Sequence, residues 1–152
     1  MSPATSTSPF TGIDHQVFVV TEMAPAVEFW ETSLGIALSF RATNDELGVD
    51  QVFFNLSDGT FIELLAPTKP SSPITRIIEK HGEGLYVLAM QVTELQSATA
   101  TLKVNGANIQ GEGTEQVFIK PALAGTPMIQ LWPKDRPHRW RDDLSPPTTQ
   151  EN

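Results

Sequence analysis

Val20-Thr21-Glu22-Met23 recurs 72 residues later as Val92-Thr93-Glu94-Leu95. Each copy follows an apolar run typical of a strand, at residues 15–20 and 86–92, and precedes a segment with helical spacing. Self-similarity at a fixed distance indicates an architecture more firmly than local propensity does, because each copy must form the same supersecondary unit. The sequence therefore predicts one strand-helix module that occurs twice.

The two predicted helices differ in the strength of their apolar face. In the first, apolar residues recur at the spacing of one helical face, namely Met23, Ala26, Val27, Trp30 and Leu34. The second has a weaker stripe of Leu95, Ala98 and Leu102. A glycine after each helix, Gly35 and Gly106, is typical of a helix end. Thr21 and Thr93 are expected to cap the helix starts through their side-chain oxygens.

Three further strands are predicted after each helix, at residues 37–42, 48–56 and 60–65, then at 108–110, 115–119 and 128–132. The sequence thus predicts an α+β fold of two βαβββ modules, at about 12–66 and 84–133. A linker at 67–83 joins them, with a short helix that starts at Pro73. The chain length favours one domain, at 12–140. The ends, 1–11 and 141–152, are polar and rich in Ser, Thr or Pro, and are expected to be flexible tails.

The composition excludes several classes of function. The 152 residues carry a formal net charge of -8, whereas nonspecific nucleic-acid binding rests on Lys and Arg that neutralise phosphates. Cysteine is absent, which excludes disulfides, thiolate ligands and a cysteine nucleophile. No apolar run approaches the roughly 20 residues that span a membrane, and the N-terminus lacks the layout of a signal peptide. A cytoplasmic protein without a nucleic-acid or membrane partner is expected.

Glu63 is the anomalous residue of the predicted strands. It lies in Phe61-Ile62-Glu63-Leu64-Leu65, where both faces of the strand are otherwise apolar. A carboxylate there must find a partner, a metal or water, or take up a proton. The repeat places Gln130, in Met128-Ile129-Gln130-Leu131-Trp132, at the equivalent position of the second module. Two polar residues at matching points of two apolar strands indicate a site rather than surface variation.

Four short motifs occur along the chain: Ile13-Asp14-His15, Phe61-Ile62-Glu63-Leu64-Leu65-Ala66-Pro67, Ser72-Pro73-Ile74 and Gly82-Glu83-Gly84-Leu85. Their order and spacing resemble the vicinal-oxygen-chelate superfamily of glyoxalases, bleomycin resistance proteins and dioxygenases, and are most similar to methylmalonyl-CoA epimerases. The resemblance covers about residues 12–132. It implies a curved, mostly antiparallel sheet around a cleft that takes a small-molecule substrate. It also implies a homodimer, by which relatives cover the edge strands of their modules.

In that superfamily, four strand residues, two from each module, converge on a divalent cation. The resemblance assigns His15, Glu63 and Gln130 to three of these positions as metal ligands, but the repeat aligns the fourth, Val87, with His15. Valine cannot bind a metal. A non-haem iron dioxygenase needs two histidines and a carboxylate, and one imidazole, one carboxylate and one amide make a poor zinc or nickel site. The expectation is therefore no cofactor, or a weakly bound divalent metal ion that keeps several waters.

Without a metal, the same side chains still make a coherent acid-base site. Desolvation suits Glu63 to gain and lose a proton near neutrality, while His15 is the complementary acid or polarises a carbonyl. Gln130 or Tyr86 is expected to donate to a developing enolate oxygen, although strict alternation turns Tyr86 away from the face of Val87. Contacts to the substrate are expected from Phe61, Val87, Met128, Trp132 and Gln51.

These residues support three functions. The leading prediction is an epimerase, an isomerase-like enzyme or a lyase that moves a proton next to a carbonyl of a small organic substrate, in an epimerisation or in a rearrangement or cyclisation of specialised metabolism. The second is a metal-free binding protein of the bleomycin-resistance kind, whose ligand lies against Phe61, Met128 and Trp132. The third is a metal-dependent methylmalonyl-CoA epimerase or glyoxalase I relative. In a purely structural interpretation, His15 and Glu63 form an internal hydrogen-bonded pair.

Overall fold

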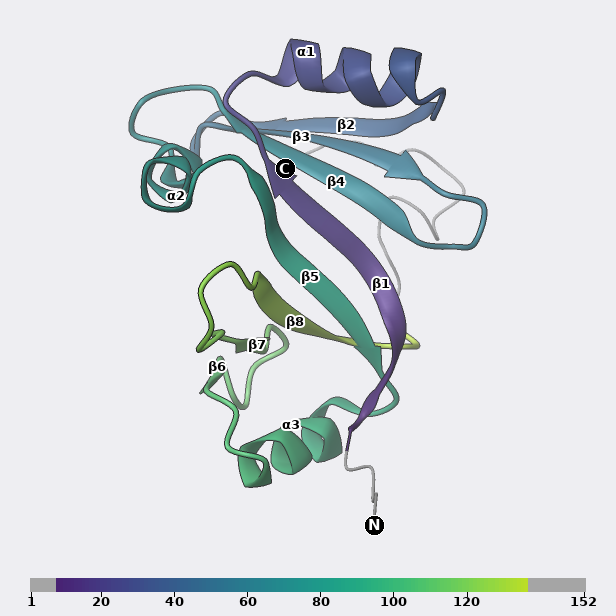
Figure 1. Ribbon diagram of the computed structural model, residues 1–152, viewed down its shortest axis with the longest axis vertical. Coiled ribbons are helices and arrows are strands. Elements are labelled where there is room, and N and C mark those ends of the chain that lie inside the picture. Colours follow the sequence, from purple (N-terminus) through teal and green to yellow (C-terminus); the bar gives the residue numbers. More distant parts are fainter. Residues whose placement is uncertain (1–7, 137–152) are drawn as a thin grey trace. The chain divides into compact units, whose positions relative to one another are not determined.

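The computed structural model describes residues 8–136 of the chain. Its elements follow in the order β1 (Phe10–Val19), α1 (Met23–Val27), η1 (Glu28–Ser33), β2 (Leu38–Asn44), β3 (Val49–Asn55), β4 (Phe61–Pro67), α2 (Pro73–His81), β5 (Gly84–Val92), α3 (Leu95–Val104), β6 (Ile109–Gln110), β7 (Phe118–Ile119) and β8 (Met128–Pro133) (Figure 1). A strand, a helix and three strands therefore occur twice, which confirms the two βαβββ modules and the α+β class. The linker helix also starts at Pro73, as predicted.

The single domain expected at 12–140 divides into two compact units that do not coincide with the sequence modules. Of the described residues, the first unit contains His15–Tyr86, and the second contains Val87–Arg136 together with residues 8–14. The N-terminal tail predicted for residues 1–11 extends too far, because β1 already starts at Phe10. Phe10 packs on the core of the second unit, and the Thr11 hydroxyl donates to the Gln91 carbonyl at 3.3 Å. Residues 1–7 and 137–152, with the rest of both predicted tails, lie outside the described part of the chain.

The first unit is built on a sheet in the strand order β2-β3-β4-β1, in which β1 is parallel to β4 and the other pairs are antiparallel. Side chains alternate between the two faces of a strand. One face is apolar and packs against α1 and η1, and Figure 1 shows α1 lying along these strands. The buried residues of this core are Met23, Val52, Phe54, Ile62, Leu64 and Ala66. The opposite face carries His15 and Glu63.

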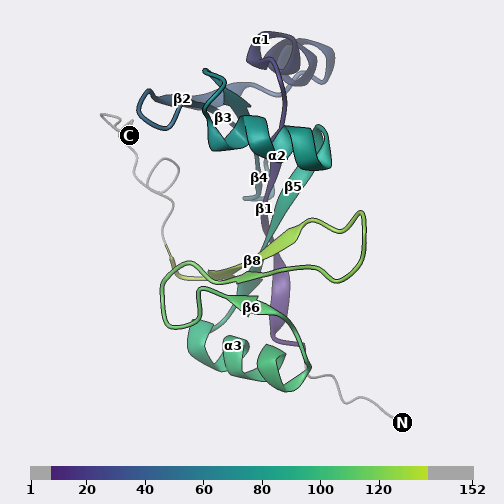
Figure 2. The same cartoon turned by 90° about the vertical axis from the view of Figure 1, so that its left-hand side faces the viewer.

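The second unit repeats this plan. Its strand order is β5-β8-β7-β6, with β5 parallel to β8 and the other pairs antiparallel. Helix α3 lies beside β6 (Figure 2) and buries Ala98 and Leu102 against Val92, Val117 and Leu131. In each unit the first strand of a module is thus parallel to its last strand, and one helix covers an apolar face.

The first predicted helix has the expected length, but it changes from an α-helix to a π-helix along its course. Helix α1 continues into η1, a π-helix in which Leu34 N donates to Phe29 O at 3.0 Å. Trp30 still packs on the apolar face of the sheet, so the predicted apolar stripe is confirmed. Gly35 follows with φ 75°, a left-handed conformation that favours glycine and ends the helix.

The helix starts are not capped by the predicted threonines, Thr21 and Thr93. At α3 the capping residue is Glu94, whose carboxylate accepts from Ser97 N at 2.9 Å and from Gln96 N at 3.1 Å. The threonine lies one residue too early in the chain to take this position. The N–H groups of Ser97 and Gln96 lower the pKa of Glu94 below its usual value, because they stabilise the charged carboxylate.

Replacing Glu94 by alanine is expected to lower the melting temperature at pH 7, because the cap of α3 is lost. A carboxyl whose pKa is lowered by folding stabilises the fold above its usual pKa and loses that effect as the pH falls through the lowered value. The difference from the wild type should therefore stay constant from pH 7 down to the usual glutamate pKa of about 4.3 and shrink below it, as thermal unfolding followed by circular dichroism can measure. Glu22→Ala is the matched control, since Glu22 precedes α1 and makes no side-chain cap. Equal losses in both variants would contradict the capping role.

Candidate active site

Glu63 lies in the middle of β4, on the face of the first unit's sheet that is opposite α1. Its Oε2 accepts a hydrogen bond from Gln51 Nε2 at 3.0 Å, and both side chains are half-buried. The antiparallel register of β3 and β4 pairs Gln51 with Leu65 and Phe53 with Glu63. Gln51 and Glu63 are therefore diagonal neighbours, a separation that long side chains can bridge. The carboxylate that the sequence singles out has an amide partner.

His15 lies on β1, next to the same row of side chains. The parallel register pairs His15 with Phe61 and Val17 with Glu63. The imidazole stacks on the Phe61 ring, with 4.2 Å between the centroids and 14° between the planes. Only 4% of His15 and 2% of Phe61 are exposed, so the stack fixes the plane of the imidazole. Of the predicted site residues, the structure brings together His15, Phe61, Glu63 and Gln51.

Gln130 holds the corresponding position in the second unit. Glu63 pairs with Val17 across the β1–β4 pair, and Gln130 pairs with Ala89 across the β5–β8 pair. Val17 and Ala89 are themselves separated by the 72 residues of the repeat. The strand register therefore confirms the predicted equivalence of Glu63 and Gln130, which is half-buried on β8.

The positions at which the superfamily holds its cation do not form a metal-binding set in this chain. Val87 pairs with Met128 as His15 pairs with Phe61, so valine stands at the position in the second unit that is equivalent to His15. It is buried and has no donor atom. Of the two ligand positions in the second unit, Val87 and Gln130, only Gln130 has a donor atom, and its amide is a neutral ligand of low affinity for transition metals. Among residues 8–136, no group of three or more His, Asp or Glu side chains is placed to hold a metal ion.

Trp132, at the end of β8, contacts a residue that sequence reasoning missed. The Arg136 guanidinium lies over the indole at 4.9 Å from its centroid, and the indole Nε1 donates to the Arg136 carbonyl at 3.4 Å. Arg136 Nη2 in turn donates to the Glu115 carbonyl at 2.7 Å. Arg136 therefore occupies one face of Trp132, a predicted substrate contact. Of the other predicted contacts on these strands, Met128 is half-buried and Val87 is buried. The four-residue spacing of Trp132 and Arg136 is a weak signal that could have indicated this contact.

Tyr86 packs against His81 at the end of α2, with 6.2 Å between the ring centroids and 43° between the planes. Its side chain is half-buried. The contact agrees with strand alternation, which turns Tyr86 away from the face that carries Val87. It gives no support to the predicted role of Tyr86 as a donor to an enolate oxygen.

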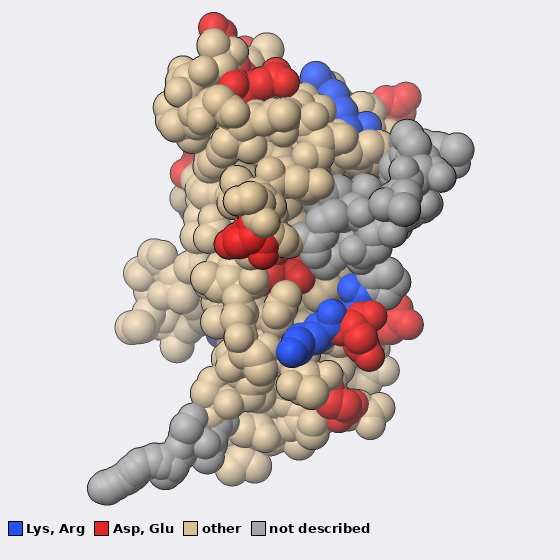
Figure 3. Space-filling view, turned by 90° about the vertical axis from the view of Figure 1, so that its right-hand side faces the viewer, with Lys and Arg blue, Asp and Glu red and all other residues tan. Residues whose placement is uncertain are grey.

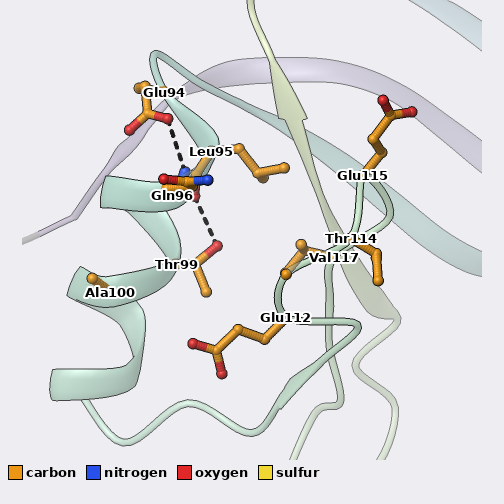
Figure 4. Close-up of a pocket in the computed structure, with 10 residues that line it drawn as sticks. Glu94, Leu95, Gln96, Thr99, Ala100, Glu112, Thr114, Glu115 and Val117 are labelled. Atoms are coloured by element: carbon orange, nitrogen blue, oxygen red, sulfur yellow. Dashed lines mark hydrogen bonds between the residues drawn. The ribbon is translucent and has the colours of Figure 1, made fainter.

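A pocket of about 600 Å³ lies in the second unit, between the start of α3 and the loop before β7 (Figure 4). Three glutamates line it, and Figure 4 shows Glu115 across the pocket from Glu94. Glu94 is engaged as the cap of α3, and Glu112 forms an ion pair with Lys103 at 3.1 Å. No histidine lines this pocket. It therefore lacks an imidazole to accompany its carboxylates, whereas the first unit combines Glu63 with His15.

The described basic side chains do not form a broad patch on the face shown in Figure 3, where Lys and Arg groups lie beside acidic ones. Two cations of the described residues are paired with carboxylates: Arg41 with Asp50 at 2.7 Å and Lys103 with Glu112. The hydrogen bond to Asp50 also raises the pKa of Arg41. None of the helices within residues 8–136 is long and apolar enough to cross a membrane.

The chain is similar to known proteins over most of its length. The family model of the Glyoxalase/Bleomycin resistance protein/Dioxygenase superfamily matches residues 14–120. The ethylmalonyl-CoA/methylmalonyl-CoA epimerase of Cereibacter sphaeroides is 28% identical over 124 residues, which cover 81% of this chain and 89% of that protein. The mitochondrial methylmalonyl-CoA epimerase of Mus musculus is 28% identical over 127 residues and covers 78% and 71% of the two chains. The crystal structure of methylmalonyl-CoA epimerase from Mycobacterium tuberculosis is 30% identical, with a TM-score of 0.66 over 84% of this chain and 91% of that chain.

Proposed function

Because the chain belongs to the glyoxalase/bleomycin resistance protein/dioxygenase superfamily, we propose that it is an epimerase-type enzyme that moves a proton next to a carbonyl of a small organic substrate. The names of its relatives support the enzyme class. The observation that carries the proposal is the group of Glu63, Gln51 and His15 on one face of the first unit's sheet. This group supplies a carboxylate and an imidazole on adjacent strands, the two parts that such acid-base catalysis needs.

In the proposed reaction, the Glu63 carboxylate removes the proton from the carbon next to the carbonyl. The electron pair of the C–H bond forms the C=C bond of an enolate, and negative charge moves to the carbonyl oxygen, which a hydrogen-bond donor must stabilise. We assign this role to an imidazole N–H of His15. If the protonated Glu63 returns its proton to the same face of the planar carbon, the substrate is restored. If water donates a proton to the opposite face instead, the stereocentre is inverted, and Glu63 then releases its proton to the solvent. Gln130, at the equivalent position of the second unit, is proposed as a substrate-binding residue.

Acyl-CoA thioesters with a substituent at C2 are the first probes, because relatives are named as epimerases of ethylmalonyl-CoA and methylmalonyl-CoA. The purified protein is incubated in D2O with one epimer of each thioester, before and after treatment with EDTA. We expect one deuterium at C2 together with inversion of that carbon, and we expect both to persist after EDTA because the donor set does not fit a metal. Tight binding of the thioesters without exchange would contradict the proposal and favour a binding protein.

We also infer that the protein forms a homodimer. Within the described residues, β2 lies at an edge of the sheet in the first unit and β6 at an edge in the second. An uncovered edge is a template for pairing with other chains, and two-fold symmetric dimers are the commonest homo-oligomers. Light scattering coupled to gel filtration should give a mass of about twice the 16.7 kDa of one chain. A mass of one chain at micromolar concentration would contradict the dimer.

A further inference from the structure

We infer that Gln51 is a positioning residue that orients the Glu63 carboxylate, rather than a contact to the substrate. The inference rests on the proposed function, in which Glu63 moves the proton. The side-chain nitrogen of Gln51 lies 3.0 Å from Glu63 Oε2. An ionised carboxylate can only accept hydrogen bonds, so the NH2 group of the amide must face it. The amide that the sequence assigns to the substrate is thus turned towards the proposed base.

Gln51 and His15 approach Glu63 from opposite sides. Strand β4 lies between β3, which carries Gln51, and β1, which carries His15. Along β4, Gln51 is level with Leu65 and His15 is level with Phe61, one on each side of Glu63. The hydrogen bond therefore restrains Oε2 on the flank away from the imidazole. A base works only within a narrow range of orientations, and displacement by about 1 Å can cost roughly 100-fold in rate.

Two buried rings are the neighbours of Glu63 on its face of the sheet. Phe53 is directly opposite on β3, Phe61 precedes Glu63 by two residues, and the two ring centroids are 6.0 Å apart. Both rings are almost fully buried. A hydrogen bond to a charged group is stronger in apolar surroundings than in water. The bond from Gln51 is therefore a substantial restraint on the carboxylate.

The strands that carry the pair are fixed from the other face of the sheet. Val52 and Phe54 on β3 and Leu64 on β4 are all 0% exposed in the core beneath α1. A slip of β4 by one residue would move Glu63 into that core and expose Leu64. The backbone therefore holds both ends of the Gln51–Glu63 bond, and the bond from Gln51 restrains Oε2 of the carboxylate.

The test compares Gln51→Met with Gln16→Met in the thioester exchange assay. Methionine keeps the length of glutamine and removes the donor. Gln16 follows His15 directly on β1, and successive side chains of a strand point to opposite faces. The amide of Gln16 is therefore on the other face of the sheet. We expect Gln51→Met to reduce kcat by roughly 10-fold to 100-fold with KM within about twofold, and Gln16→Met to leave both unchanged. Gln51→Glu keeps the shape of the side chain and adds charge repulsion with Glu63, so it should reduce kcat at least as much. It replaces Gln51→Met in the test if the methionine variant does not fold.

The outcomes separate this inference from the proposed function. Wild-type protein that exchanges no deuterium, or a Glu63→Gln variant as active as the wild type, would overturn the proposed function and this inference with it. If Glu63→Gln is inactive but Gln51→Met keeps the wild-type kcat, only the role of Gln51 is overturned. A rise in KM at constant kcat would make Gln51 a substrate contact instead. A crystal structure of Gln51→Met gives a readout without substrate, since an unmoved Glu63 carboxylate would also overturn the inference.

Discussion

Substitution of Glu63 by glutamine should reduce exchange of the substrate proton by about 10²-fold to 10⁴-fold, the usual contribution of a positioned general base. Glutamine keeps the size of the side chain and removes its ability to accept a proton. The substrate should still bind, because the change leaves the neighbouring rings of Phe53 and Phe61 in place. The measurement is the rate of deuterium incorporation at C2 under saturating thioester, followed by mass spectrometry.

Glu79→Gln is the matched control, since Glu79 is an exposed glutamate of α2. It makes the same chemical change outside the proposed site and should leave the exchange rate within about twofold. Glu63→Asp keeps a carboxylate but shortens the side chain by one methylene, and should retain part of the activity. Deuterium incorporation by Glu63→Gln at the rate of the wild type would remove Glu63 from the mechanism.

The sequence predicts the architecture well because the repeat and the apolar patterns are local signals. The 72-residue offset aligns Val17 with Ala89, and the strand register then aligns Glu63 with Gln130. The same offset aligns Val87 with His15, so the sequence alone predicts that one of the four ligand positions has no donor atom. Glu63 could be found because one carboxylate between apolar neighbours on both strand faces is costly unless it is engaged.

The partners of these residues could not be predicted, because they depend on how strands pair. Gln51 reaches Glu63 only in the register of the β3–β4 hairpin. Its turn is held by Gly59, with φ 91°, and by the hydrogen bond from Thr60 N to Asp58 Oδ1 at 3.0 Å. A turn one residue longer would have placed another side chain beside Glu63. The apolar pattern predicts on which face of the sheet a side chain lies, whereas the turn decides which residue of the adjacent strand lies beside it.

The sequence also could not predict that β1 is divided between the two units. The apolar pattern of residues 15–20 marks only the part of β1 in the first unit. Before it, Phe10 is isolated among small and polar residues, which favours a tail. Its burial depends on contacts with the distant core that contains Val92. Burial by residues far along the chain leaves no periodic signal in the segment that is buried.

Phe54→Ala is expected to lower the free energy of unfolding by about 3–5 kcal/mol, the usual cost of truncating a buried phenylalanine. Phe54 is 0% exposed, and its ring lies 6.2 Å from that of Trp30, the residue by which η1 packs on the sheet. The loss is a large share of the roughly 5–15 kcal/mol typical of a folded domain, and urea denaturation should show it as a lower midpoint at constant slope. Phe29→Ala removes a half-exposed ring from the same helix and should cost less than about 1 kcal/mol. Equal losses would mean that η1 does not cover this core, and the apolar face opposite Glu63 would need another explanation.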